Sequence, residues 1–151
     1  DALLFLHEIM QTTIYKRTGD SERVLGYTEN DTSPDGLPLP AGLIFRRHWD
    51  ASIEIGRYDE TGHVFRRTTY DEKLVGHVTG GGAIFSSGLF EGGELGWVDP
   101  DGVVVQGGFM LGEEEVGRVD GPQPNAAAAA LLLIFLPEEA EEDRRMNRQI
   151  P

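Results

Sequence analysis

The chain has 151 residues, and its 26 acidic against 13 basic residues give a formal net charge of −13. This charge repels phosphate backbones and anionic lipid headgroups, so it argues against nucleic acid or a membrane surface as a partner. The chain contains no cysteine, which excludes a disulfide framework, a thiolate metal site and a cysteine nucleophile. The length fits a single domain over residues 1–151. The compartment stays open, with the cytoplasm slightly favoured.

The N-terminal 41 residues divide into two parts. Apolar residues at helical spacing, among them Leu3, Leu6 and Met10, predict a buried helix over Ala2 to Gln11, and Thr12 to Arg17 reads as a strand, so 1–17 is a helix and a strand. Residues 18–41 are rich in Pro, Gly, Asp and Asn, which predicts an irregular surface loop.

Glycines with a 20-residue period dominate the middle of the chain, residues 42–121. In one row each glycine is followed, one residue later, by an apolar pair: Gly42, Gly62, Gly82 and Gly102. In a second row the residue before the glycine is apolar from Gly56 onward: Gly36, Gly56, Gly76 and Gly96, continued by Gly117. A fixed period of this kind predicts a structural repeat.

Each unit reads as a β-hairpin. Asp and Pro before the first-row glycine, as in Pro100-Asp101-Gly102, are turn residues, and glycine supplies the positive φ that such turns need. One hairpin cannot cover its own apolar face, so successive units must pair. The sequence therefore predicts a mainly β fold: an antiparallel sheet, roll or barrel of about four 20-residue hairpin repeats.

The C-terminal part, residues 122–151, is an apolar segment followed by an acidic tail. Asn125 is placed to cap a helix that runs from Ala126 to Leu136 with no polar face. The segment is shorter than a membrane-spanning helix, which needs about 20 residues. Because the sheet can cover only one side of it, we expect a homo-oligomer, most simply a two-fold dimer, through Ala126 to Leu136. Pro137 then starts a charged, solvent-facing helix.

Two short fragments resemble known repeats. Gly56 to Gly62, followed by Tyr70-Asp71, is similar to the tyrosine-aspartate repeats of bacterial surface and toxin shells. Gly92 to Trp97 is similar to the glycine-rich hairpin repeats of the membrane-occupation type. Neither resemblance covers the chain or assigns it to a family.

His48-Trp49-Asp50 is the densest polar and aromatic cluster. If the surrounding residues form a strand, alternation sends His48 and Asp50 to one face, where the carboxylate could orient the imidazole as a general base. The same alternation sends Trp49 to the other face, toward the core. The alternative is an exposed pair without catalytic function.

Paired arginines fall at equivalent positions of neighbouring units. Arg46, Arg47, Arg66 and Arg67 could form an anion-binding groove, since like charges placed together need a partner. The alternative is a set of ion pairs to nearby acidic residues: Asp50, Glu54, Asp71 or Glu72.

Metal and cofactor sites find little support. His63 and His77 could share a cation with Asp59 or Asp71, and the turns Asp59 to Gly62 and Asp99 to Gly102 could bind calcium. Scattered histidines and short loops argue against both, and we expect no tightly held metal. No nucleotide, phosphate-loop or serine-elbow motif is present, so no cofactor is predicted.

These observations favour a non-catalytic β-repeat domain that serves as an interaction or scaffold surface and self-associates, with a protein partner also possible. Repeats place equivalent side chains in rows, which makes broad surfaces rather than one asymmetric pocket. The alternative is a small ligand-binding protein or hydrolase with its site near Arg46, His48, Asp50 and Arg66.

Overall fold

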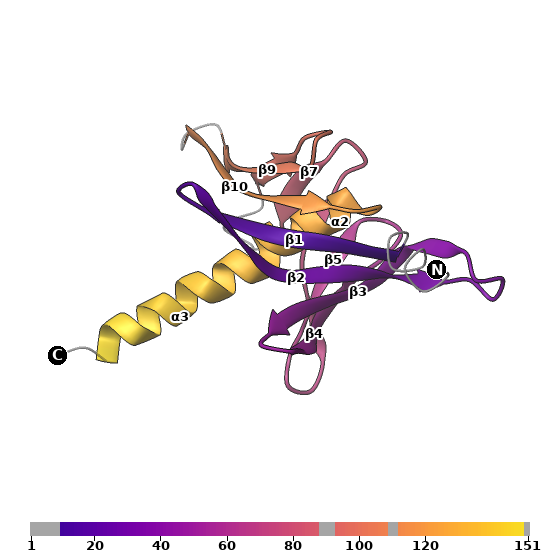
Figure 1. The fold of residues 1–151 in the computed structure, drawn as a ribbon, viewed down its shortest axis with the longest axis horizontal. Helices are drawn as coiled ribbons and strands as arrows, with labels where there is room; N and C mark the ends of the chain where they lie inside the picture. The colour runs from indigo at the N-terminus through magenta and orange to yellow at the C-terminus, as the bar shows by residue number, and fades with distance from the viewer. Residues whose placement is uncertain (1–9, 88–92, 109–111, 150–151) are drawn as a thin grey trace.

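The computed structural model describes residues 10–87, 93–108 and 112–149, and they form a closed antiparallel β-barrel around a C-terminal helix (Figure 1). Each strand pairs with its neighbours in chain order, and β1 closes the barrel on β10 through pairs such as Ile14 with Val119. The predicted mainly β roll or barrel is confirmed in this coarse form. The ten strands are β1 (Gln11–Thr18), β2 (Ser21–Thr32), β3 (Pro38–His48), β4 (Ala51–Tyr58), β5 (His63–Arg67), β6 (Glu72–Val78), β7 (Ala83–Ser86), β8 (Glu94–Val98), β9 (Val103–Gly108) and β10 (Gly112–Asp120).

The N-terminal region differs from the prediction. Residues 18–41 are not an irregular loop, because β2 and the start of β3 occupy most of them and leave 33–37 as the connection. Prolines at the beginning of β3 are compatible with a strand, since a strand tolerates proline at its first residue or on an edge. The predicted helix over Ala2 to Gln11 falls mainly on residues 1–9, outside the described residues, and Gln11 begins β1.

The predicted turns at Gly62, Gly82 and Gly102 are confirmed. Their φ angles are 89°, 93° and 87°, in the region that favours glycine. Each donates its N–H to the carbonyl three residues earlier, on Asp59, Thr79 and Asp99 respectively. The three glycine carbonyls in turn accept from the N–H groups of Val78, Val98 and Val119, which links each turn to the next hairpin.

A β-bulge recurs in the pairs β1–β2, β3–β4, β5–β6, β7–β8 and β9–β10, and explains the apolar residue before the second-row glycines. The register shifts at Leu25, Ile55, Val75, Leu95 and Val116, each just before a glycine. A bulge increases local twist and bends the strand, which favours barrel closure. Gly26 takes the first place in this row, whereas Gly36 lies in the β2–β3 connection with φ 81°.

The C-terminal helix passes through the barrel. It consists of α2 (Pro124–Ala130), a π-helical turn η1 (Leu131–Phe135) and α3 (Leu136–Gln149). Every residue from Ala126 to Phe135 is at most 7% exposed, and α2 packs against strands on all sides of the barrel. Figure 1 shows α3 leaving the barrel and projecting away from it. An apolar helix without a polar face is therefore buried all round within one chain.

This burial removes the reason for expecting a dimer through Ala126 to Leu136. The expectation assumed that the sheet covers one side of the helix and leaves another exposed. Because the sheet closes around the helix, only Leu136 at its end is partly exposed. Self-association stays a prediction, and any surface for it lies elsewhere.

The π-helical turn matches the five second-row glycines residue by residue. A Cβ added to a glycine would lie between 2.8 and 3.1 Å from one η1 side chain, and each of the five glycines faces a different one. The pairs are Gly117 with Leu131, Gly96 with Leu132, Gly76 with Leu133, Gly56 with Ile134 and Gly26 with Phe135. The hydrogen bond from the Leu136 N–H to the Leu131 carbonyl spans five residues, so this turn is wider than an α-helical turn and holds more side chains. This spacing matches the five hairpin units around the barrel.

Candidate functional site

The basic residues around the α3 end of the barrel bind the first turn of α3. Glu138 forms ion pairs with Arg46 on β3 and with Arg66 on β5, the latter at 2.9 Å. Glu139 forms ion pairs with Lys16 on β1 and, at 2.8 Å, with Arg23 on β2. Arg46 also lies over the Phe135 ring, with its guanidinium carbon 5.3 Å from the ring centroid. Two glutamates thus tie four strands to the helix.

These ion pairs account for two of the four arginines of the predicted anion groove. A third, Arg67, pairs with Glu54 at 2.8 Å, as the ion-pair alternative predicted. Arg47 has no ion pair among the described residues. A cavity of about 310 Å³ does lie beside Arg46 and Arg66, but Glu138, Glu141 and Glu142 line it too, and their charge opposes an anion.

His48 and Asp50 do not form a catalytic pair in the described structure. Both are exposed at the tip of the β3–β4 hairpin, and no hydrogen bond or ion pair joins their side chains. The ring of His48 instead contacts Trp49 edge-on at a centroid distance of 6.3 Å. Arg46 and Arg66 both pair with Glu138, and no bond in the described residues joins either of them to His48 or Asp50, so the four residues of the predicted alternative site are not brought together.

Trp49 contradicts the expectation of a core tryptophan. It occupies the first position of the two-residue turn between His48 and Ala51, with φ 57° and 85% exposure. Among the described residues it is the one non-glycine with positive φ. At the tip of the adjacent β5–β6 hairpin, Tyr70 is 98% exposed. Strand alternation does not predict this exposure, because the strand ends at His48 and Trp49 lies in the turn.

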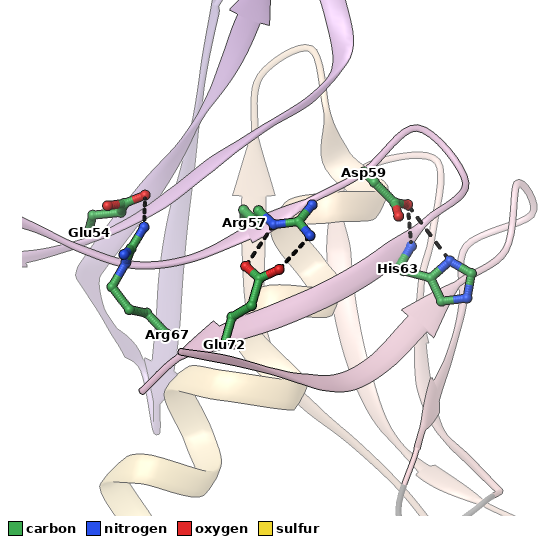
Figure 2. A network of polar contacts seen from close by, with 6 residues as sticks. All are labelled: Glu54, Arg57, Asp59, His63, Arg67 and Glu72. Atoms are coloured by element: carbon green, nitrogen blue, oxygen red, sulfur yellow. Dashed lines mark hydrogen bonds and ion pairs between the residues drawn. The ribbon is translucent and has the colours of Figure 1, made fainter. Parts of the chain in front are cut away.

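Polar contacts on the outer wall hold neighbouring hairpins together (Figure 2). Arg57 donates two hydrogen bonds to Glu72, at 2.7 and 2.6 Å, and lies over the Phe65 ring. The hydrogen bond from Arg57 lowers the pKa of Glu72. Burial acts to raise the pKa of Asp59, but hydrogen bonds from the Thr61 hydroxyl and from the His63 and Thr61 N–H groups outweigh it and lower that pKa. Asp59 is thus a turn residue whose carboxylate caps its own hairpin.

The two histidines proposed as metal ligands are neighbours on the outer wall. His63 and His77 are directly cross-strand partners, with ring centroids 6.0 Å apart. His77 also stacks on Phe85 at 5.1 Å, and His63 Nδ1 lies 2.7 Å from the Thr61 hydroxyl oxygen. Over the described ranges, no group of three or more histidine, cysteine or acidic side chains is placed to hold a metal ion.

A buried polar cluster near the start of α2 was not foreseen. On the even-numbered strands one inward position is Val78, Val98 and Val119, but in the first two units it is Thr28 and Tyr58. Thr28, Asn30 and Tyr58 are at most 3% exposed, and no group in the described residues bonds to the two hydroxyls or to Asn30 Oδ1. Burial raises the pKa of Tyr58 to about 12, against a smaller opposing effect of the Thr28 hydroxyl. Tyr58 lies 20 residues before Val78, so its departure from valine could have been read from the 20-residue period, whereas Thr28 does not follow that period.

Gly42 explains how the tyrosine fits. A Cβ at Gly42 would lie 2.8 Å from the Tyr58 hydroxyl and 2.1 Å from the Glu29 carbonyl oxygen. A pocket of about 170 Å³ opens beside Tyr58, between the turns at Asp59 to Gly62 and Thr79-Gly80 and the start of α2. Tyr58 lines this pocket, but its hydroxyl oxygen is buried and not exposed to solvent.

Comparison of the chain with protein-family models, with curated proteins and with solved structures finds no match. None of the helices in the described ranges combines the length and the apolar character that a membrane crossing requires.

Proposed function

We propose that this chain is a non-catalytic interaction domain that self-associates through its outer surface. The observation that carries this proposal is the filled interior. A barrel of ten strands could enclose a ligand, but here ten buried residues of the chain itself, Ala126 to Phe135, occupy the barrel interior. What remains for function is the outer wall, the hairpin tips and the projecting α3.

The distribution of reactive side chains supports the same proposal. A catalytic centre needs a nucleophile or base with an orienting partner at one concave place. In the described residues His48 and Asp50 stand exposed at a hairpin tip without a bond between their side chains, and Arg46, Arg66 and Arg67 are paired with Glu138 or Glu54. A rigid closed barrel with ion-paired walls is suited to present surfaces rather than to do chemistry.

The test is sedimentation equilibrium of the whole chain between about 1 and 200 μM. We expect a concentration-dependent mass that fits a monomer–dimer equilibrium. A constant monomer mass over this range would contradict self-association.

The alternative function, a small ligand-binding protein, gains support from the unpartnered polar cluster of Thr28, Asn30 and Tyr58. It would place the site at the α2 end of the barrel and not near His48. Saturable NMR shifts confined to these residues on addition of a small neutral molecule would favour it.

A further inference from the structure

Trp49 combines two unfavourable features. Its backbone is in the left-handed region, with φ 57°, which is unfavourable for a residue that carries a side chain. Its indole is 85% exposed, and among the described residues the one ring that contacts it is that of His48, edge-on, so little packing compensates for this conformation. Glycine is the residue that hairpin turns prefer at such a position. Strained, exposed residues of this kind mark functional positions.

The tip of the neighbouring hairpin provides a second anchor. Tyr70 is 98% exposed, and its hairpin is joined to that of Trp49 by the β4–β5 pairing and by the ion pair of Arg67 with Glu54. Tryptophan, tyrosine and arginine are the residues that most often dominate the binding energy of protein interfaces. Trp49 and Tyr70 thus stand at the tips of two paired hairpins, and we name the exposed residues at these tips the tip surface: Arg47, Trp49, Asp50, Tyr70 and Asp71.

The charges of the tip surface indicate which kind of partner it binds. Arg47, two residues before Trp49, and Asp71, the residue after Tyr70, have no ion pair with any side chain in the described ranges. The surface therefore carries cation and anion side by side on a chain with a net charge of −13. A strongly basic partner would be attracted more strongly to the acidic remainder of the chain than to this surface. A second copy of the chain has the same net negative charge, so the two copies can approach with least repulsion at a surface that carries both signs of charge.

Resting on the proposed self-association, we propose that the tip surface is the contact between two copies of this chain. In a two-fold contact, Trp49 of each copy packs on Tyr70 of the other, which places Arg47 opposite Asp71 twice. The four aromatic side chains together supply roughly 600–1,000 Å² of contact area. This is the low end of specific interfaces, so a dissociation constant on the order of micromolar or weaker is expected.

The experiment compares dimer dissociation constants of whole-chain variants by sedimentation equilibrium. Trp49→Gly should weaken association at least about tenfold, because the tryptophan anchor is lost. At the same time its thermal midpoint should be no lower than that of the native chain, since glycine relieves the positive φ. Tyr70→Ser should also weaken association. Leu37→Ser is the matched control: Leu37 is 64% exposed in the β2–β3 connection, away from the tip surface, and should change nothing.

A charge exchange tests the two-fold arrangement. Arg47→Asp and Asp71→Arg should each weaken association, and the double variant should recover most of the native affinity. Association of the native chain that is insensitive to Trp49→Gly and Tyr70→Ser would overturn the tip surface while leaving the proposed function standing. A native chain that stays monomeric would overturn both. Loss of association in the Leu37→Ser control to the same degree would also contradict the tip surface.

Discussion

At the scale of single residues, the second-row glycines are required by close packing on two sides. At Gly76 a Cβ would lie 2.2 Å from the Phe85 carbonyl oxygen and 2.8 Å from both Leu133 methyl carbons. The carbonyl belongs to the sheet and the leucine to the helix, so neither can move without disturbing the barrel. The glycine recurs in the sequence because the sheet and the helix approach each other too closely at these positions for a side chain.

Gly76→Ala is expected to destabilise the chain by about 3 kcal/mol, at the upper end of the cost of overpacking, since backbone as well as side chain must shift. Gly80→Ala is the control, because a Cβ there meets nothing within 4 Å. It should change the free energy of unfolding by no more than about 0.5 kcal/mol. Urea unfolding followed by circular dichroism measures both, and equal midpoints for the two variants would contradict the packing argument.

Tyr58 is expected to make the free energy of unfolding fall as the pH rises above 10. Its pKa is raised from 10.0 to about 12 in the folded chain, and the side chain is 3% exposed. A raised pKa means that the folded state holds the proton more tightly, so the contribution is complete below pH 10 and is lost as pH rises through 12. Two pKa steps correspond to about 2.7 kcal/mol.

We therefore expect Tyr58→Phe to lose less unfolding free energy than the native chain between pH 10 and 12, by about 2–3 kcal/mol. Tyr70→Phe, at a fully exposed position, should keep the native pH dependence. Urea titrations at several pH values give the comparison. Parallel curves for the native chain and Tyr58→Phe would show that the tyrosine ionises as easily in the folded chain as in the unfolded one.

At the scale of elements, the helix and the barrel specify each other. The five residues of η1 each face one glycine, and the glutamates of the following turn pair with basic residues of β1, β2, β3 and β5. Exposed ion pairs contribute little, but these glutamates are mostly buried, and each is shared by two cations. The π-helical turn would be unfavourable alone, and its match to the glycine row accounts for its presence.

Ile134→Glu should prevent folding. Ile134 is fully buried and lies against the glycine position on β4, so a carboxylate there would be desolvated without a partner. The cost of several kcal/mol is comparable to the about 5–15 kcal/mol that stabilise a typical domain. Met146→Glu on the projecting part of α3, where the side chain is 59% exposed, is the control and should fold normally. A folded, monomeric Ile134→Glu chain would instead indicate that the segment is exposed.

The sequence predicted the hairpins from local signals but not the closure of the sheet. Turn glycines at Gly62, Gly82 and Gly102 act within a few residues, so their spacing is sufficient to place them. The first unit was missed because its prolines and Asp31, Asp35 resemble a loop, whereas pairing with β1 and β3 decides the strand. Whether Ala126 to Leu136 is covered by its own sheet or by another chain depends on closure through β1 and β10, which no local pattern encodes.

The candidate site was less predictable than the fold. Arg46 and Arg66 both form ion pairs with Glu138, which lies 92 residues after Arg46 in the sequence. Only the path of the helix through the barrel brings these residues together. Tyr58 could have been found, since it replaces valine at a position that recurs every 20 residues, but Thr28 lies outside that period and only the strand pairing places it beside Tyr58's row. The exposure of Trp49 depends on where the strand ends, and element boundaries are the least certain part of a sequence-based prediction.

At the scale of the whole molecule, the barrel depends on its last 30 residues. Removing 122–151 would leave its interior without Leu131, Leu132, Leu133, Ile134 and Phe135, each buried and each worth about 1.5–3 kcal/mol of apolar transfer. Their sum, roughly 7–15 kcal/mol, is as large as the stability of a typical domain.

We therefore expect chain 1–121 to lack a cooperative thermal transition. Chain 1–142, which keeps the buried segment and both bridging glutamates, is the control and should unfold with nearly the native midpoint. Calorimetry of the two truncated chains decides the matter, and a native-like transition in chain 1–121 would mean that the ten strands form a stable barrel without the helix.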